Sequence, residues 1–135
     1  MTLESQFVAI FQLSLAALLS LVIGLDRERQ RTEAGLRTHM LVGIGSCLFT
    51  YLSSGAFPDD PARITAQIVA GIGFLGAGAI LKRGDGIQGL TTAASIWATA
   101  AVGMAVGLGA WFIAIVATLL IWFILAIVRR LELTK

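Results

Sequence analysis

Long apolar blocks alternate with short polar connections along almost the whole of this 135-residue chain. Each block approaches the roughly 20 residues that a helix needs to cross a bilayer. With 57% hydrophobic and 13% charged residues, the chain lies outside the range of ordinary soluble domains. We therefore predict an all-α integral membrane protein, a single bundle of five transmembrane helices. The expected spans are residues 6–25, 38–55, 63–81, 91–107 and 109–129.

The basic residues predict how these spans are oriented. Nine of the ten Lys and Arg residues fall on one side of the expected topology, and only Arg63 falls on the other. Because basic residues collect on the cytoplasmic side, the N-terminus should lie outside and the C-terminus in the cytoplasm. A four-span alternative would treat residues 92–128 as one helix. It would place Arg129 and Arg130 on the outer side, against the distribution of the other basic residues. The glycines at 107 and 109 favour a tight outer hairpin instead, and so five spans.

The connections between the spans differ in composition. Residues 26–37 form the longest polar stretch, where acids and arginines three and four apart predict a short surface helix ending near Gly35. Residues 55–62 hold two prolines and two aspartates, which predicts a turn. Residues 82–89 are expected to form a Gly-rich inner loop, after which one of the threonines at 91–92 would cap the fourth helix.

Two carboxylates stand where the first span leaves the membrane. Asp26 and Glu28 alternate with arginines, and oxygen ligands at such a boundary suit a hard cation such as Mg²⁺. The simpler interpretation is that these acids and arginines neutralise one another. Arg37 would reach lipid phosphates or pair with Asp26, and His39 is either a proton-sensitive group or an ordinary interfacial histidine. We expect no cofactor other than Mg²⁺.

The sequence offers no motif that would support an enzyme. Residues 71–76 match the dinucleotide fingerprint GxGxxG, but the match lies inside an apolar span with no strand before it. A closely packed helix segment explains it better. No Walker lysine motif, nucleophile elbow or zinc-ligand set occurs, so we expect no enzymatic activity. A net charge of +2 without a continuous basic patch argues against nucleic acid and for membrane lipids as partners.

Small residues recur every fourth position on two of the expected helices. They predict helix contact faces, either within a protomer or between two protomers. No Asp, Glu, Lys or Arg lies deep inside an expected span, which argues against an autonomous active transporter. Gln67 is expected to hydrogen-bond across helices. The two small-residue faces consist of Ser95, Thr99, Gly103 and Gly107, and of Ala62, Ala66 and Ala70.

Four sequence blocks together resemble the MgtC/SapB family. They are GLDRER at 24–29, AGLRTHMLV at 34–42, IGFLGAGAI at 72–80 and GLTTAASIW at 89–97. The acid-Arg pair of the family falls on Asp26 and Arg27, and its Arg-Thr pair falls on Arg37 and Thr38. Beside these, the functional candidates are Gln67, Gly73, Gly76, Gly78, Thr91 and Thr92.

This resemblance implies a multi-pass protein of the bacterial inner membrane, linked to magnesium homeostasis and growth at low Mg²⁺. In pathogens it implies a role in virulence, through survival inside macrophages. Family members are described as acting on the F-type ATP synthase and on magnesium-transporting P-type ATPases. Well-studied members continue into a soluble cytoplasmic domain, whereas we expect residues 1–135 to be one transmembrane domain without it.

Three functions are compatible with these features. We expect a homodimeric regulator that binds membrane partners in magnesium adaptation. The alternative is a transporter or channel for Mg²⁺ or another cation, which Asp26 and Glu28 would collect at the inner side. A third interpretation is a bundle that organises lipids without a defined partner.

Overall fold

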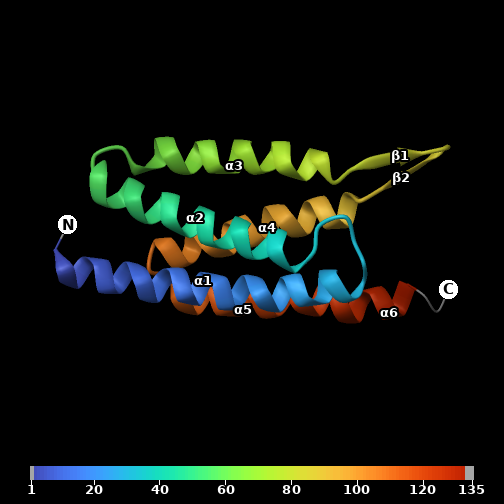
Figure 1. The fold of residues 1–135 in the computed structure, drawn as a ribbon, viewed down its shortest axis with the longest axis horizontal. Coiled ribbons are helices and arrows are strands. Elements are labelled where there is room, and N and C mark those ends of the chain that lie inside the picture. The colour runs from blue at the N-terminus through green and yellow to red at the C-terminus, as the bar shows by residue number, and fades with distance from the viewer. Residues whose placement is uncertain (1, 133–135) are drawn as a thin grey trace.

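A computed structural model describes residues 2–132, and within them the side chains of all but residues 82, 83 and 132. The described chain is helical apart from one short hairpin (Figure 1). The last three elements follow one another without a break, so that a π-helical segment interrupts one long final helix. The elements are α1 (Leu3–Arg29), α2 (Leu36–Ala56), α3 (Pro61–Gly78), β1 (Leu81–Arg83), β2 (Gly86–Gln88), α4 (Leu90–Gly107), α5 (Trp111–Phe123), η1 (Ile124–Val128) and α6 (Arg129–Glu132).

Three of the described helices are long and apolar enough to cross a membrane. They are α1, α4 and the continuous helix Trp111–Leu131. α2 is also long, at 21 residues, but it is not among these three; it includes Arg37, His39 and hydroxyl side chains such as Ser46 and Thr50. The expectation of an all-α protein is confirmed, and three of the five expected spans coincide with described helices that are long and apolar enough to cross a membrane.

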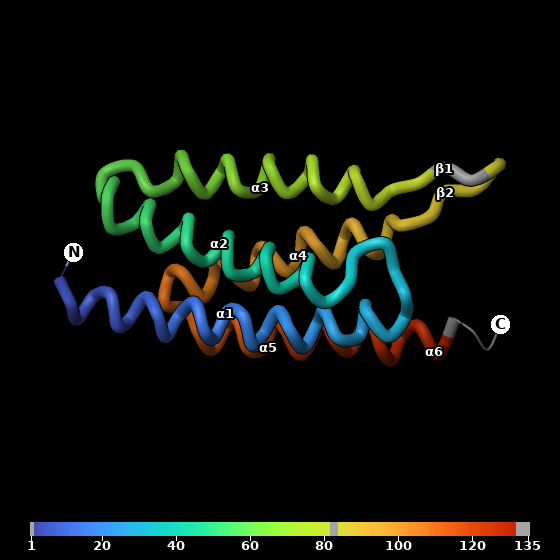
Figure 2. Tube along the Cα trace, in the orientation of Figure 1, coloured from blue at the N-terminus to red at the C-terminus, as the bar shows by residue number. Residues whose placement is uncertain are grey.

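α4 lies at the centre of the helix packing. It contacts α1, α2, α3 and α5, while α3 packs on α2 and α4, and α5 packs on α1 and α4. α1, α3 and α5 run in one direction and α2 and α4 in the other (Figures 1 and 2). Two apolar clusters fill the contacts, one around Ile23 and Val106 and the other around Ile72 and Ile96. This arrangement brings the start of α4 next to the end of α1.

Small residues let α2 and α4 approach closely. A Cβ atom on Gly107 would lie 2.6 Å from the carbonyl oxygen of Cys47, closer than real Cβ atoms come to other atoms. The small-residue face predicted on α4 is therefore used inside the chain, where all four of its members are buried. The other predicted face, on α3, is exposed along the described helix and consists of Ala62, Ala66 and Ala70.

Glycines with positive φ shape both connections of α4. Gly109, at φ +80°, follows α4 and permits the tight hairpin predicted at residues 107–109. Before α4, the predicted loop is instead the antiparallel hairpin of β1 and β2, in which Leu81 pairs with Gln88. Gly84, at φ +59°, supplies the left-handed residue that a two-residue turn needs. Because of this hairpin, α3 ends at Gly78 and not at residue 81 as expected.

Gly89, not a threonine, precedes α4. It adopts φ +87°, and no side chain caps the helix there, so the predicted cap by Thr91 or Thr92 is wrong. A Cβ atom at position 89 would collide with the carbonyl oxygen of Ala79. The end of α3 thus fixes how the chain enters α4, and it leaves the threonine hydroxyls available for other contacts.

The polar stretch after the first span does not form a separate helix. α1 continues through Asp26 and Arg29, and the chain then reverses at Arg31, which adopts φ +53°. The predicted surface helix ending near Gly35 is therefore wrong. The acids and arginines favour helix, as expected, but they extend α1 because Asp26 and Arg27 are buried against neighbouring helices.

Candidate functional site

A buried ion pair lies at the end of α1. Asp26 is 8% exposed and Arg27 is 4% exposed. Arg27 Nε donates to Asp26 Oδ2 over 3.1 Å, and Arg27 Nη2 contacts the same oxygen. Charged groups this far from solvent need such pairing, since each would otherwise lose its hydration without compensation. The neutralising interpretation of these residues matches this geometry.

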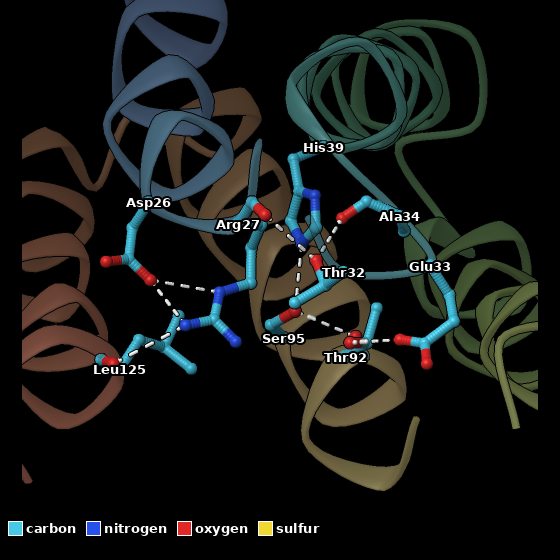
Figure 3. Close-up of polar contacts among 9 residues, drawn as sticks. All are labelled: Asp26, Arg27, Thr32, Glu33, Ala34, His39, Thr92, Ser95 and Leu125. Carbon is cyan, nitrogen blue, oxygen red and sulfur yellow. Dashed lines mark hydrogen bonds and ion pairs between the residues drawn. The ribbon is translucent and has the colours of Figure 1, made fainter. Parts of the chain in front are cut away.

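The same guanidinium ties α1 to the last helix. Arg27 Nη2 lies 3.4 Å from the carbonyl oxygen of Leu125, which belongs to the π-helical segment η1 (Figure 3). A π turn departs from the regular hydrogen-bond ladder of an α-helix, and such turns are frequent at functional sites. Residues 98 positions apart are thereby joined through one side chain.

The turn between α1 and α2 is held by its own polar side chains. Glu28 Oε2 accepts a hydrogen bond from the backbone N–H of Leu36 over 2.9 Å, at the first residue of α2. A carboxylate suits that position, because the N–H groups of a helix start are unpaired and the helix dipole favours negative charge there. The Thr32 hydroxyl lies 3.1 Å from the carbonyl oxygen of Arg27 and 2.9 Å from that of Ala34.

Two further contacts connect this end to α4. His39, which is fully buried, places Nδ1 2.8 Å from the carbonyl oxygen of Gly35 and Nε2 2.9 Å from Ser95 Oγ. A carbonyl oxygen only accepts, so Nδ1 carries a hydrogen. Thr92 Oγ1 donates to Glu33 Oε2 over 3.0 Å. Ser95 Oγ also lies 2.7 Å from the carbonyl oxygen of Thr92, so the two contacts are neighbours on α4 (Figure 3).

We call these residues the helix-end cluster, because their side chains link neighbouring elements directly or, as for Asp26, hold the side chain that does. The cluster joins α1, α2, α4, η1 and the turn between α1 and α2. Most of its side chains are buried. What it can do chemically is lock the helix ends together. Its members are Asp26, Arg27, Glu28, Thr32, Glu33, His39, Thr92 and Ser95.

Several predicted site residues lie outside this cluster. Arg37 and Thr38 are exposed on the first turn of α2, and Thr91 is exposed on α4. On α3, Gln67, Gly73 and Gly78 are exposed, and a Cβ atom on either glycine would meet open space. Gly76 differs, because it is buried and a Cβ atom there would lie 3.5 Å from the carbonyl oxygen of Ala93. The candidates thus divide among the helix-end cluster, α3 and exposed positions near the starts of α2 and α4.

The two carboxylates expected to bind Mg²⁺ have different surroundings. Asp26 is buried and paired, whereas Glu28 is exposed and engaged with the start of α2. Two residues apart on a helix, they point to different sides. The described residues contain no group of three or more His, Cys, Asp or Glu side chains that could hold a metal ion. Metal binding by this pair stays a prediction.

Sequence reasoning missed four positions that contribute to these contacts. Glu33 and Thr32 belong to the polar stretch, but their contacts depend on the reversal at Arg31. Ser95 was expected only as a small residue for packing, although its hydroxyl is what His39 meets. Position 125 gave no signal at all, because its contribution is a backbone carbonyl in an apolar tract.

Comparison with known proteins identifies similar sequences. The model of the MgtC family matches residues 13–134. YhiD of Escherichia coli K12, whose name assigns it provisionally to magnesium transport, is 44% identical over 131 residues, which cover 90% of this chain and 61% of YhiD. MgtC of Salmonella typhimurium LT2 is 46% identical over 115 residues, 85% of this chain and 50% of that protein.

A Haemophilus influenzae protein is 45% identical over 118 residues, which cover 79% of this chain and 50% of that protein. The chain spans about half to three fifths of the length of the curated relatives it matches. No solved structure matches the chain.

Proposed function

Because the chain belongs to the MgtC family, we propose that it is a five-span inner-membrane protein of bacteria that adapts cells to low magnesium by binding and modulating membrane partners. The three long apolar helices support a membrane location, and α2 and α3 would complete the five spans. The N-terminus would lie outside and the C-terminus in the cytoplasm.

The distribution of charge supports this orientation. The end of the molecule that holds the helix-end cluster carries exposed Arg29, Arg31, Arg37 and Arg130. The opposite end has Arg63, which faces Asp60 at 3.6 Å. By the positive-inside tendency, the helix-end cluster would lie at the cytoplasmic face. There it would be within reach of the cytoplasmic parts of other membrane proteins.

The observation that carries the proposal is the unpacked outer face of α3. Gly73 and Gly78 have open space where a Cβ atom would be, and Phe74 is 82% exposed. The amide of Gln67 lies on the same helix and is exposed too. Small residues with one amide are the features through which helices associate in lipid. A second copy, giving a homodimer, or another membrane protein would cover this face.

The resemblance suggests which partners to test first. These are the F-type ATP synthase and magnesium-transporting P-type ATPases, together with a second copy of this chain. A role in virulence would follow only in a pathogen and through such partners. Enzymatic activity is not part of the proposal, because the sequence carries no catalytic motif that would support it.

A second candidate function is transport of Mg²⁺ or another cation. The specific observation in its favour is the name of YhiD, which connects that relative with magnesium transport. In this reading, Asp26 and Glu28 would collect the ion at the inner side. The buried pairing of Asp26 with Arg27 counts against it, because the carboxylate would have to leave its partner to bind the ion.

Two experiments separate the candidates. In proteoliposomes loaded with a Mg²⁺ dye, we expect no flux above empty vesicles; flux that falls in Asp26→Asn/Glu28→Gln would favour the transporter. In cells, a photo-crosslinking residue at Gly73 should capture the same chain or a membrane partner. The matched control is Leu18, which is 58% exposed on α1. Equal yields from both positions would contradict partner binding through α3.

A further inference from the structure

An apolar groove of about 470 Å³ lies between α2 and α3, which run antiparallel beside each other in Figure 1. Buried Val42, Ile68 and Ile72 line it, together with Phe49, which is 58% exposed. Its volume is within the range of small-molecule sites, about 300–1,000 Å³. Gly73, where the crosslinking test of the partner face is placed, does not line this groove.

The hydroxyl group of Ser46 reaches the groove without a hydrogen-bond partner. Ser46 lines the groove and is only 3% exposed. Its Oγ makes no hydrogen bond within the described part of the chain, yet it is not among the buried, unpaired atoms that are fully occluded there, which are Gln12 Oε1, Thr50 Oγ1 and Arg129 Nε. The remaining access to Ser46 Oγ is from the groove. A buried hydroxyl without a partner is costly, so an occupant that pairs with it gains affinity.

Gln67 adds a second free group from the other wall. It lines the groove from α3, and its amide makes no hydrogen bond to any described residue. A hydroxyl both donates and accepts, and an amide offers two donors and one acceptor oxygen. The described residues that line the groove include no Asp, Glu, Lys or Arg. The occupant should therefore be neutral, with a carbonyl or hydroxyl group on an apolar skeleton.

The depth of these two groups narrows the class of occupant. Ser46 is ten residues from either end of α2 (Leu36–Ala56), which is about 15 Å at 1.5 Å per residue. Gln67 is six residues from the start of α3 (Pro61–Gly78), about 9 Å. In the proposed five-span arrangement, on which this inference rests, both lie inside the hydrocarbon core, about 30 Å thick. The phosphate and ester groups of ordinary lipids stay in the interfacial region, so they do not reach Ser46.

We propose that the α2–α3 groove binds a membrane quinone, whose ring carbonyls accept hydrogen bonds from Ser46 Oγ and Gln67 Nε2. A quinone ring is neutral and apolar apart from these carbonyls, so it can lie at this depth, and it can pack against the Phe49 ring. Two glycines leave room for it. Gly45 and Gly71 line the groove, and a Cβ atom on either would meet open space.

The probe for the test is a ubiquinone analogue with a photoreactive azido group on its ring, added to the full chain in proteoliposomes. After illumination, mass spectrometry identifies the labelled peptides, and excess decylubiquinone serves as competitor. We expect saturable labelling within residues 41–49 and 64–75, which the competitor abolishes. Absence of labelling there would overturn the proposal. Labelling that the competitor does not reduce would also overturn it, because the groove would then take acyl chains in general.

Variants connect this labelling to the groove. Gly71→Leu places a side chain in the groove and should abolish saturable labelling, whereas Gly73→Leu, which has open space but lies off the groove, should not alter it. Gly45→Leu fills the groove from α2 should Gly71→Leu not fold. Ser46→Ala/Gln67→Leu removes both hydrogen-bonding groups and should weaken quinone binding about tenfold. Unaltered binding in the folded groove-filling variant or in this double variant would disprove the site.

Other measurements keep this site apart from the proposed function. Crosslinking at Gly73 tests the partner face, and thiol labelling of Ser54→Cys tests the five-span arrangement, and neither needs a quinone. In a Cys47→Ala background, disulfide formation between two copies of Gln67→Cys that the quinone does not prevent would assign the groove to a second copy of the chain. That result would overturn the proposal, whereas inhibition of this disulfide by decylubiquinone would support it.

Discussion

Replacing Arg27 by Met should destabilise the folded protein strongly. Arg27 is 4% exposed and Asp26 is 8% exposed, so the variant would leave a carboxylate buried without its counter-charge. Removing one partner of a buried ion pair typically costs about 3–5 kcal/mol. The hydrogen bond to the carbonyl oxygen of Leu125 would be lost as well, although its length of 3.4 Å makes it the smaller effect.

A double variant separates this charge effect from a packing effect. Asp26→Leu/Arg27→Met removes both charges and keeps roughly the same volume, so we expect it to regain most of the loss and lie within about 1–2 kcal/mol of the wild type. Arg37→Met is the matched control, because the same substitution at an exposed position should change the free energy of unfolding by less than about 0.5 kcal/mol.

The free energies can be measured by unfolding the purified protein in mixed micelles of increasing SDS content. Far-ultraviolet circular dichroism reports the helices, and tryptophan fluorescence reports their packing. A loss below about 1 kcal/mol in Arg27→Met would refute the claim that this pair is desolvated. A double variant no more stable than Arg27→Met would show that packing, and not the unpaired charge, causes the loss.

Two further predictions concern packing and topology. Gly107→Leu should cost at least about 1–3 kcal/mol in the same assay, because its Cβ atom would lie 2.6 Å from the Cys47 carbonyl oxygen, whereas Gly45→Leu, with open space around its Cβ atom, should be tolerated. In a Cys47→Ala background, an impermeant thiol reagent on intact cells should label Ser54→Cys and leave Thr32→Cys unlabelled. Labelling of position 32 alone would invert the proposed orientation.

The sequence predicts helices here better than it predicts their ends. Apolar blocks separated by polar connections indicate where helices lie, and the glycines at 107 and 109 indicate the hairpin, because both signals are local. The length of α1 is not a local property. It continues to Arg29 because Asp26 and Arg27 find buried partners, and one of these partners is on η1. No window of sequence around residue 27 contains that information.

In the candidate site, too, the local features could be predicted from the sequence and the contacts between distant residues could not. The acids and arginines after the first span were recognisable from composition, and the pairing of Asp26 with Arg27 is between sequence neighbours. The contacts of His39 with Ser95 and of Glu33 with Thr92 join residues 56 and 59 positions apart, and they depend on how α4 is placed. The π-helical segment lies in an apolar tract without Gly or Pro, so no local sequence signal predicts it.

The contact between Arg27 and the Leu125 carbonyl has a consequence for biogenesis. α1 is synthesised before η1, so the Arg27 guanidinium lacks its Leu125 partner while nearly a hundred further residues are made. During that interval it can contact lipid phosphates or water at the membrane surface. The contact that holds the end of α1 in its final position does not yet exist. Docking of the last helix then removes Arg27 from that surface. The contact that buries Arg27 therefore forms only after both ends of the chain have been synthesised.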